Sequence, residues 1–61
     1  MEIGKEIERE RKAQRYSQRQ LGELVGRTQQ QISSYEKGDV LPNTETLEKI
    51  AKVLGKEWKL V

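Results

Sequence analysis

The sequence contains no cysteine, no histidine and no phenylalanine, and it has a single proline. Without cysteine, the chain cannot form a disulfide, a thiolate metal site or a cysteine nucleophile. Without histidine, it lacks the commonest metal ligand and the usual general base near neutral pH. The remaining carboxylates, hydroxyls and lysines have little room for a water-excluding pocket in 61 residues. We therefore expect neither an enzyme nor a protein with a cofactor, a metal or a small-molecule substrate.

Long hydrophobic runs are also missing. No apolar stretch approaches the roughly 20 residues that span a bilayer, and no secretory segment follows Met1. The abundance of Glu, Lys, Arg, Gln and Leu favours helices. The length allows one domain, because a chain of this size buries only about 60% of its unfolded surface. We expect a single cytoplasmic all-α domain over residues 1–61, with no membrane contact.

Positive charge is concentrated in the middle of the chain. The formal net charge of +2 is too small to indicate nucleic-acid binding by itself. Residues 11–37, however, contain six basic residues against two acidic ones, whereas residues 38–61 contain four of each. Such a basic stretch is expected where a polyanion docks, but a solvated helical surface with ordinary charge scatter explains it equally well.

Start and stop signals divide the chain into four predicted helices, at about residues 2–14, 17–26, 28–38 and 43–55. Two helix starts have the spacing of a capping box, in which side chains and backbone donors satisfy one another: Ser17 with Gln20, and Thr28 with Gln31. Asn43 is the expected cap of the last helix. Three helices end at a glycine, the residue preferred there: Gly26, Gly38 and Gly55. The tail, residues 56–61, is ambiguous between a strand-like segment and a further helical turn.

Apolar side chains recur at helical spacing and define a predicted core. Its members are Ile3, Ile7, Leu21, Leu24, Val25, Ile32, Tyr35, Leu47, Ile50, Ala51 and Leu54. Tyr16, directly before the Ser17 cap, is expected to pack against Leu21 as a hydrophobic staple.

The second and third predicted helices are joined by only Gly26 and Arg27. A link this short makes the helices cross steeply, and the glycine supplies the positive φ that the turn needs. Gly22, inside the second helix, costs roughly 1 kcal/mol relative to Ala. We expect this glycine to permit close approach of the third helix.

The outer face of the third predicted helix is rich in amides and hydroxyls. With Ile32 and Tyr35 turned inward, helical geometry turns five polar residues outward: Gln29, Gln30, Ser33, Ser34 and Lys37. Gln and Ser both donate and accept hydrogen bonds, and Gln can pair with adenine through two of them. Alone, the Gln29–Gln31 run is better explained as a soluble surface. On the second helix of a tight pair, it favours contact with bases.

The spacing of these residues is highly specific when taken together. The pattern consists of Ser17-Gln18, Leu21-Gly22, Gly26, Thr28-Gln29-Gln30, Ile32-Ser33, Tyr35-Glu36 and Gly38, followed by Pro42, Leu47, Ile50-Ala51 and Leu54-Gly55. It resembles the Cro and phage-repressor (lambda-repressor-like, XRE-type) family of helix-turn-helix proteins over roughly residues 3–55. The resemblance implies a compact domain of four to five helices, with the helix-turn-helix at about residues 17–37. It also implies sequence-specific binding of double-stranded DNA through the major groove. The protein would then be a transcriptional repressor or regulator, or its isolated DNA-binding domain, associated with the nucleoid in a prokaryote or phage host.

The resemblance also implies roles for individual residues. Gln29, Gln30 and Ser34 would contact base edges, with Gln30 the strongest candidate and Ser33 on the same face. Gln18 would clamp a phosphate, where free N–H groups and the helix dipole favour an anion. Further candidate phosphate contacts are Arg19, Arg27 and Lys37, of which Arg27 and Lys37 are favoured, and the backbone N–H groups near Asn43 and Thr44. Each basic residue is equally well explained as a solvated side chain. Arg15 is a weaker candidate.

Arg11 and Glu36 match a buried ion pair of family members, which joins the first helix to the end of the third. The pair could orient the third helix, with Arg11 also reaching a phosphate, or it could hold the fold. We favour the structural role, in which removing one partner of a buried pair costs about 3–5 kcal/mol.

Two features depart from the family pattern. The loop after the third helix has Asp39 where the family often has a basic residue, which weakens the case for phosphate contacts there. Val40 and Leu41 are expected to pack, although an exposed apolar patch is the alternative. No cap introduces a fifth helix, so Trp58 and Leu60 are expected to pack over the first helix or, alternatively, to pair two protomers.

The partner and the oligomeric state remain open in the sequence. Double-stranded DNA is the expected partner, bound by a monomer or by a homodimer on a palindromic site. The alternative is a protein-interaction module, such as an antitoxin or bridging factor, that uses an apolar surface of Val40, Leu41, Trp58 and Leu60. The tidy helix caps are also compatible with an excised or engineered DNA-binding module.

Overall fold

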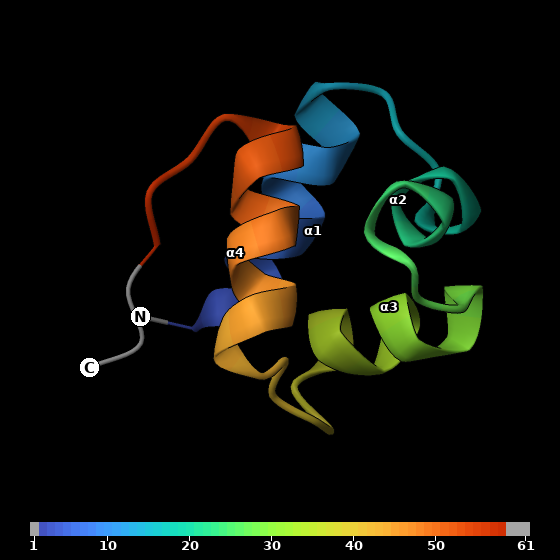
Figure 1. Cartoon of the computed structure of the whole chain (residues 1–61). Helices are drawn as coiled ribbons and strands as arrows, with labels where there is room; N and C mark the ends of the chain where they lie inside the picture. The colour runs from blue at the N-terminus through green and yellow to red at the C-terminus, as the bar shows by residue number, and fades with distance from the viewer. Residues whose placement is uncertain (1, 59–61) are drawn as a thin grey trace.

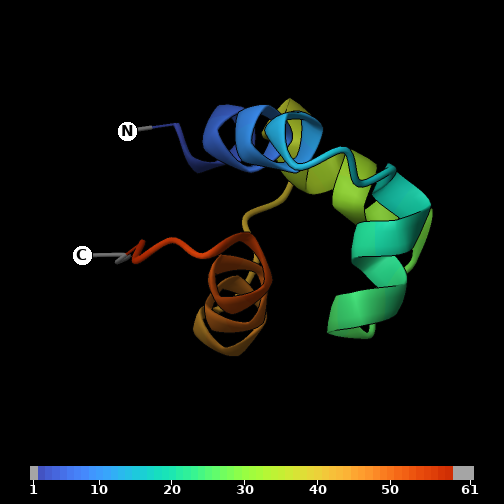
Figure 2. The same cartoon turned by 90° about the horizontal axis from the view of Figure 1, so that it is seen from above.

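A computed structural model describes residues 2–58. These residues form four α-helices and no strand: α1 (Ile3–Ala13), α2 (Gln18–Val25), α3 (Gln29–Lys37) and α4 (Thr44–Leu54). Figure 1 shows α4 in front of α1, with α2 and α3 on the other side of the molecule. Seen from above in Figure 2, α2 lies at the end opposite the first turn of α1. The all-α class and the four predicted helices are confirmed. Within the described residues, no helix has the length and apolar character needed to cross a membrane.

Side-chain caps hold the starts of α2 and α3 as predicted. The Ser17 hydroxyl accepts from the Gln20 backbone N–H at 2.9 Å, and the Ser17 N–H donates to the Gln20 side chain at 2.8 Å. Thr28 and Gln31 repeat this arrangement at 3.1 and 2.9 Å. Because both capping boxes are complete, each helix begins at a position set by its own local sequence.

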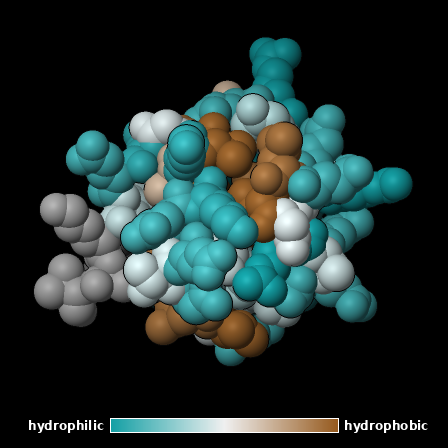
Figure 3. All heavy atoms as spheres, viewed as in Figure 1, coloured by the Kyte–Doolittle hydropathy of each residue, from teal (hydrophilic) through white to brown (hydrophobic). Residues whose placement is uncertain are grey.

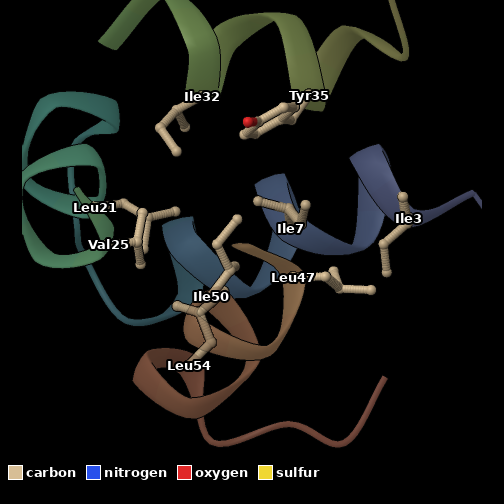
Figure 4. Packing of buried hydrophobic residues seen from close by; sticks show 9 residues of the cluster. All are labelled: Ile3, Ile7, Leu21, Val25, Ile32, Tyr35, Leu47, Ile50 and Leu54. Atoms are coloured by element: carbon tan, nitrogen blue, oxygen red, sulfur yellow. The ribbon is translucent and has the colours of Figure 1, made fainter. Parts of the chain in front are cut away.

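The hydrophobic core lies between the helices and takes side chains from all four of them (Figure 4). It consists of Ile3, Ile7, Leu21, Val25, Ile32, Tyr35, Leu47, Ile50 and Leu54. Tyr16 and Trp58 are partly buried against this cluster. Ala51 is buried as well.

Leu24 does not belong to the core, and its predicted burial was wrong: the residue is 56% exposed. The buried face of α2 is centred on Leu21, Gly22 and Val25. At 3.6 residues per turn, Leu24 lies about 100° away from the centre of that face. Helical spacing alone allowed Leu24 beside Leu21 and Val25, but α2 turns the side with Gly22 inward instead.

Two glycines allow backbone segments to meet without side chains between them. A Cβ on Gly22 would lie 2.5 Å from the Arg27 carbonyl oxygen, so the residue makes room for the turn rather than for α3 itself. A Cβ on Gly4 would collide with the Tyr35 carbonyl and lie 2.9 Å from that of Glu36. The role of Gly4, which sequence reasoning missed, is to let α1 pack directly against the end of α3.

The loop between α3 and α4 exposes its apolar residues. Val40 is 53% exposed and Leu41 is 67% exposed, so the prediction that they pack was wrong. Pro42 is fully buried and fills the space beneath the loop, which leaves the two preceding side chains outside. Figure 3 shows hydrophobic surface at the lower edge of the molecule, where Figure 1 has this loop.

The segment after α4 returns to the body of the domain. Trp58, which was predicted to pack over the first helix, is partly buried against the core cluster. The Lys56 ammonium lies 3.6 Å from the Glu10 carboxylate and so links this segment to α1. Leu60, for which the same packing was predicted, lies outside the described residues.

Candidate nucleic-acid interface

The turn between α2 and α3 fixes the angle between the two helices. Gly26 has a φ of 74°, the left-handed conformation that its predicted role requires. The Arg27 backbone N–H donates to the Gly22 carbonyl at 2.8 Å, which closes the end of α2. Together with the close contact at Gly22, this hydrogen bond holds the start of α3 against α2.

The outer face of α3 carries the predicted base-contacting residues. Gln29 and Gln30 are exposed, while Ser33 and Ser34 are half-buried. Gln30 and Ser34 share an open hollow of about 340 Å³, whose other lining residues are Thr28, Gln31, Tyr35 and Val40. The hollow therefore has polar groups on the helix and one apolar side chain from the following loop. Gln29 does not line this hollow and lies on the other side of the exposed face.

The predicted ion pair between Arg11 and Glu36 is present and buried. The Arg11 Nε donates to Glu36 Oε2 at 2.6 Å, and Nη2 donates to Oε1 at 3.1 Å. The two side chains are 9% and 2% exposed. A third donor, Nη1, binds the Tyr16 carbonyl at 2.7 Å. These bonds join α1, the segment before α2 and the end of α3.

Gln18 takes part in the same network, which the sequence did not reveal. Its Nε2 donates to Glu36 Oε1 at 3.0 Å. The residues are 18 positions apart, and no periodicity or local motif relates them. The predicted phosphate clamp thus lies directly beside the end of α3, attached to a buried carboxylate.

Arg27 also has a partner that sequence reasoning missed. Its Nη2 donates to the Thr46 hydroxyl at 2.8 Å, which ties the α2–α3 turn to the first turn of α4. Thr46 is 2% exposed, and a buried hydroxyl needs a hydrogen-bond partner. Arg27 supplies it. One of the five guanidinium N–H groups is used in this way, and Arg27 remains half-exposed.

The other predicted phosphate contacts lie at helix ends or on exposed faces. Lys37 is exposed in the last turn of α3. Arg19 is exposed on α2, with its Nε 3.9 Å from Glu23. Asn43 caps α4 through a 2.8 Å hydrogen bond from the Thr46 N–H, and Thr44 is exposed beside it. Arg11 differs from all of these, since it is 8% exposed and three of its donors are engaged.

Comparison with known proteins identifies this arrangement. A family model described as helix-turn-helix matches residues 7–60. The chain belongs to this helix-turn-helix family. Its structure is similar to that of the P22 c2 repressor, which was solved in complex with synthetic operator 9T in the presence of Tl⁺. The TM-score is 0.87 and the sequence identity is 33%, over 90% of this chain and 83% of the repressor chain. The phage-repressor-like fold predicted from the sequence is therefore confirmed.

Two curated relatives are longer than this helix-turn-helix chain. Endothelial differentiation-related factor 1 from Rattus norvegicus and from Mus musculus are each 34% identical to it over 55 residues. The match covers 90% of this chain but spans only 37% of the length of each relative.

The residues on which a protein-interaction surface was predicted to depend differ in their exposure. Val40 and Leu41 are exposed, whereas Trp58 packs against the core. Leu60 lies outside the described residues.

Proposed function

We propose that this protein binds double-stranded DNA sequence-specifically, with α3 in the major groove, and acts as a transcriptional regulator, most naturally a repressor. The observation that carries the proposal is the likeness of its whole fold to a repressor solved with its operator. A major groove about 12 Å wide admits one α-helix, and α3 is held for such insertion by the turn at Gly26. In a prokaryotic or phage-infected host, this activity would place the protein on cytoplasmic nucleoid DNA.

The proposed base contacts come from the exposed face of α3. Gln30 and Ser34 line one hollow, so their side chains would meet neighbouring base edges. Gln29 would read the other side of the same face, and Ser33 lies between them. Because amides and hydroxyls are uncharged donors and acceptors, they distinguish base edges rather than simply attract phosphate.

The proposed phosphate contacts surround this helix: Gln18, Arg19, Arg27, Lys37, Asn43 and Thr44. The Thr46 hydroxyl orients the Arg27 guanidinium, whose remaining donors suit a phosphate. We leave Arg11 out of this set, because its guanidinium is already bound to Glu36 and Tyr16. The site offers hydrogen-bonding and charged groups for recognition, and we propose no catalytic step.

We further propose that two copies bind a palindromic site. A two-fold dimer places two recognition helices one DNA turn apart, which doubles the contacts of a small module. One experiment tests both proposals: selection of bound sequences from random duplex DNA, repeated at several salt concentrations. An enriched palindrome supports a dimer, and a single enriched half-site supports a monomer. If no motif is enriched at any salt concentration, sequence-specific binding is excluded.

A further inference from the structure

A single buried carboxylate connects the two parts of the proposed interface. Glu36 Oε1 accepts hydrogen bonds from Arg11 Nη2 at 3.1 Å and from Gln18 Nε2 at 3.0 Å. Glu36 belongs to α3, the proposed base-reading helix, whereas Gln18 is the first residue of α2. The Glu36 side chain is only 2% exposed, so it does not itself meet a ligand.

The carboxylate also determines which way the Gln18 carboxamide faces. An ionised carboxylate only accepts hydrogen bonds, whereas a primary amide has two N–H donors and one carbonyl acceptor. Rotating the carboxamide by half a turn would bring its carbonyl oxygen against Glu36 Oε1, where two acceptors repel. The nitrogen is therefore held toward Glu36, and its second N–H remains for another acceptor.

Hydrogen bonds from Arg11 hold the Glu36 carboxylate in place. Arg11 binds both of its oxygens and also binds the Tyr16 carbonyl, which directly precedes the Ser17 cap of α2. Among the described residues, no buried side-chain polar atom lacks a hydrogen-bond partner. Both Glu36 oxygens are thus engaged, and Gln18 is the outermost, half-exposed member of the network.

We infer that Glu36 is a positioning residue for DNA binding. It orients the Gln18 amide so that the second N–H donates to a backbone phosphate beside the start of α2. Because Glu36 belongs to α3, its side chain also fixes the position of the Gln18 phosphate contact relative to the base-reading face of α3. This inference depends on the proposed function and adds to it a role for a residue that does not touch DNA. Pre-orienting the amide removes the entropy cost of ordering a long side chain on binding.

A double-mutant cycle tests this inference through DNA affinity. Gln18→Ala is made in the wild-type chain and in a chain where Arg11→Met and Glu36→Met replace the ion pair with apolar residues of similar size. The probe is a short random-sequence duplex at low salt, because a phosphate contact does not require the specific site. We expect Gln18→Ala to weaken wild-type binding by about 3- to 10-fold. In the apolar-pair background, we expect the same change to weaken it by less than about 2-fold, since the amide has already lost its support. Equal losses in the two backgrounds would overturn the inference.

A second measurement in the free protein does not depend on whether the apolar pair folds. The ¹⁵N relaxation of the Gln18 side-chain amide is compared with that of Gln29 and Gln30, which are exposed amides on α3. We expect the Gln18 amide to be rigid on the picosecond-to-nanosecond timescale and the other two to be mobile. A Gln18 amide as mobile as that of Gln30 would also overturn the inference.

Failure of this inference is distinguishable from failure of the proposed function. If the wild-type chain does not bind duplex DNA at any salt concentration, both are wrong. If Gln30→Ala with Ser34→Ala abolishes recognition of the selected site, while the Gln18 losses are equal in both backgrounds, only the role of Glu36 is wrong.

Discussion

The two faces of α3 differ in chemistry although the helix is only nine residues long. The inner face consists of Ile32, Tyr35 and Glu36, which are all buried. The outer face carries exposed or half-buried amides and hydroxyls with few partners inside the protein. Substitution on the inner face should therefore change the free energy of unfolding, whereas substitution on the outer face should change DNA affinity alone. The following predictions test this division, from the largest expected effect to the smallest.

Breaking the buried ion pair on one side should have the largest effect. Glu36→Met leaves the Arg11 guanidinium buried without its carboxylate, and we expect a loss of about 3–5 kcal/mol in the free energy of unfolding. The matched control is the double variant Arg11→Met with Glu36→Met, which should recover most of the loss because no charge is left unpaired. Urea unfolding of both variants measures the difference. A double variant less stable than the single one would show that Arg11 stabilises the fold through contacts other than Glu36, such as its bond to the Tyr16 carbonyl.

The contact between α1 and the end of α3 should tolerate no side chain. Gly4→Ala places a methyl group against the Tyr35 and Glu36 carbonyls, so we expect a net destabilisation of about 1–3 kcal/mol. This is opposite to the usual gain of roughly 1 kcal/mol from replacing glycine in a helix. Thermal unfolding followed by circular dichroism gives the sign directly. A higher melting temperature would mean that α1 does not pack this closely on α3.

On the outer face, Gln30→Ala should reduce affinity for the selected site by about 1–3 kcal/mol, the contribution of one bidentate base contact. Sequence preference at one base position should be relaxed, while the free energy of unfolding stays within about 0.5 kcal/mol of the wild type. Leu24→Ala is the control, because Leu24 is also an exposed helical residue but lies outside the proposed interface. Fluorescence anisotropy on a panel of single-base variants of the site measures both effects. Unchanged preference at every position would remove Gln30 from the base contacts.

Lys37 should contribute charge rather than sequence recognition. Lys37→Ala should weaken binding to all duplexes uniformly and should lower the slope of log affinity against log salt by about 1. Lys12→Ala is the matched control: Lys12 is also exposed, lies on α1 outside the proposed interface and pairs with Glu8 at 3.4 Å. Equal slopes for the two variants would place Lys37 away from the DNA backbone.

The smallest effect is expected in the loop that follows α3. Val40→Ser and Leu41→Ser should change the free energy of unfolding by no more than about 0.5 kcal/mol, because both residues are more than half exposed. Urea unfolding midpoints are sufficient for this comparison. A larger loss would show that these side chains are buried in solution, for example by a second copy of the chain.

Local patterns predicted the parts of the fold that depend on neighbours in the chain. The capping boxes at Ser17 and Thr28 and the glycine turn at Gly26 are completed by residues within a few positions, and all three were predicted. The ion pair of Arg11 with Glu36 spans 25 positions, and only the family resemblance suggested it. The family resemblance was therefore the source of this prediction of a contact between distant residues.

The errors and omissions concern contacts between distant segments. Leu24 has an apolar side chain at helical spacing, yet the orientation of α2 turns it toward solvent. The bonds from Gln18 to Glu36 and from Arg27 to Thr46 join residues 18 and 19 positions apart. No periodicity relates such pairs, because they meet only when whole helices pack.

The sequence by itself determined where α2, α3 and α4 begin and end and which face of α3 is polar. These properties follow from hydrogen bonds and side-chain directions within one or two helical turns. Only the tertiary structure decided which apolar residues are buried and which polar residues share a partner. Burial depends on the angle at which helices meet, and that angle is set by contacts such as Gly22 with Arg27 and Gly4 with Tyr35. For the same reason, the connection of the outer face of α3 to Gln18 through Glu36 became visible only in the folded chain.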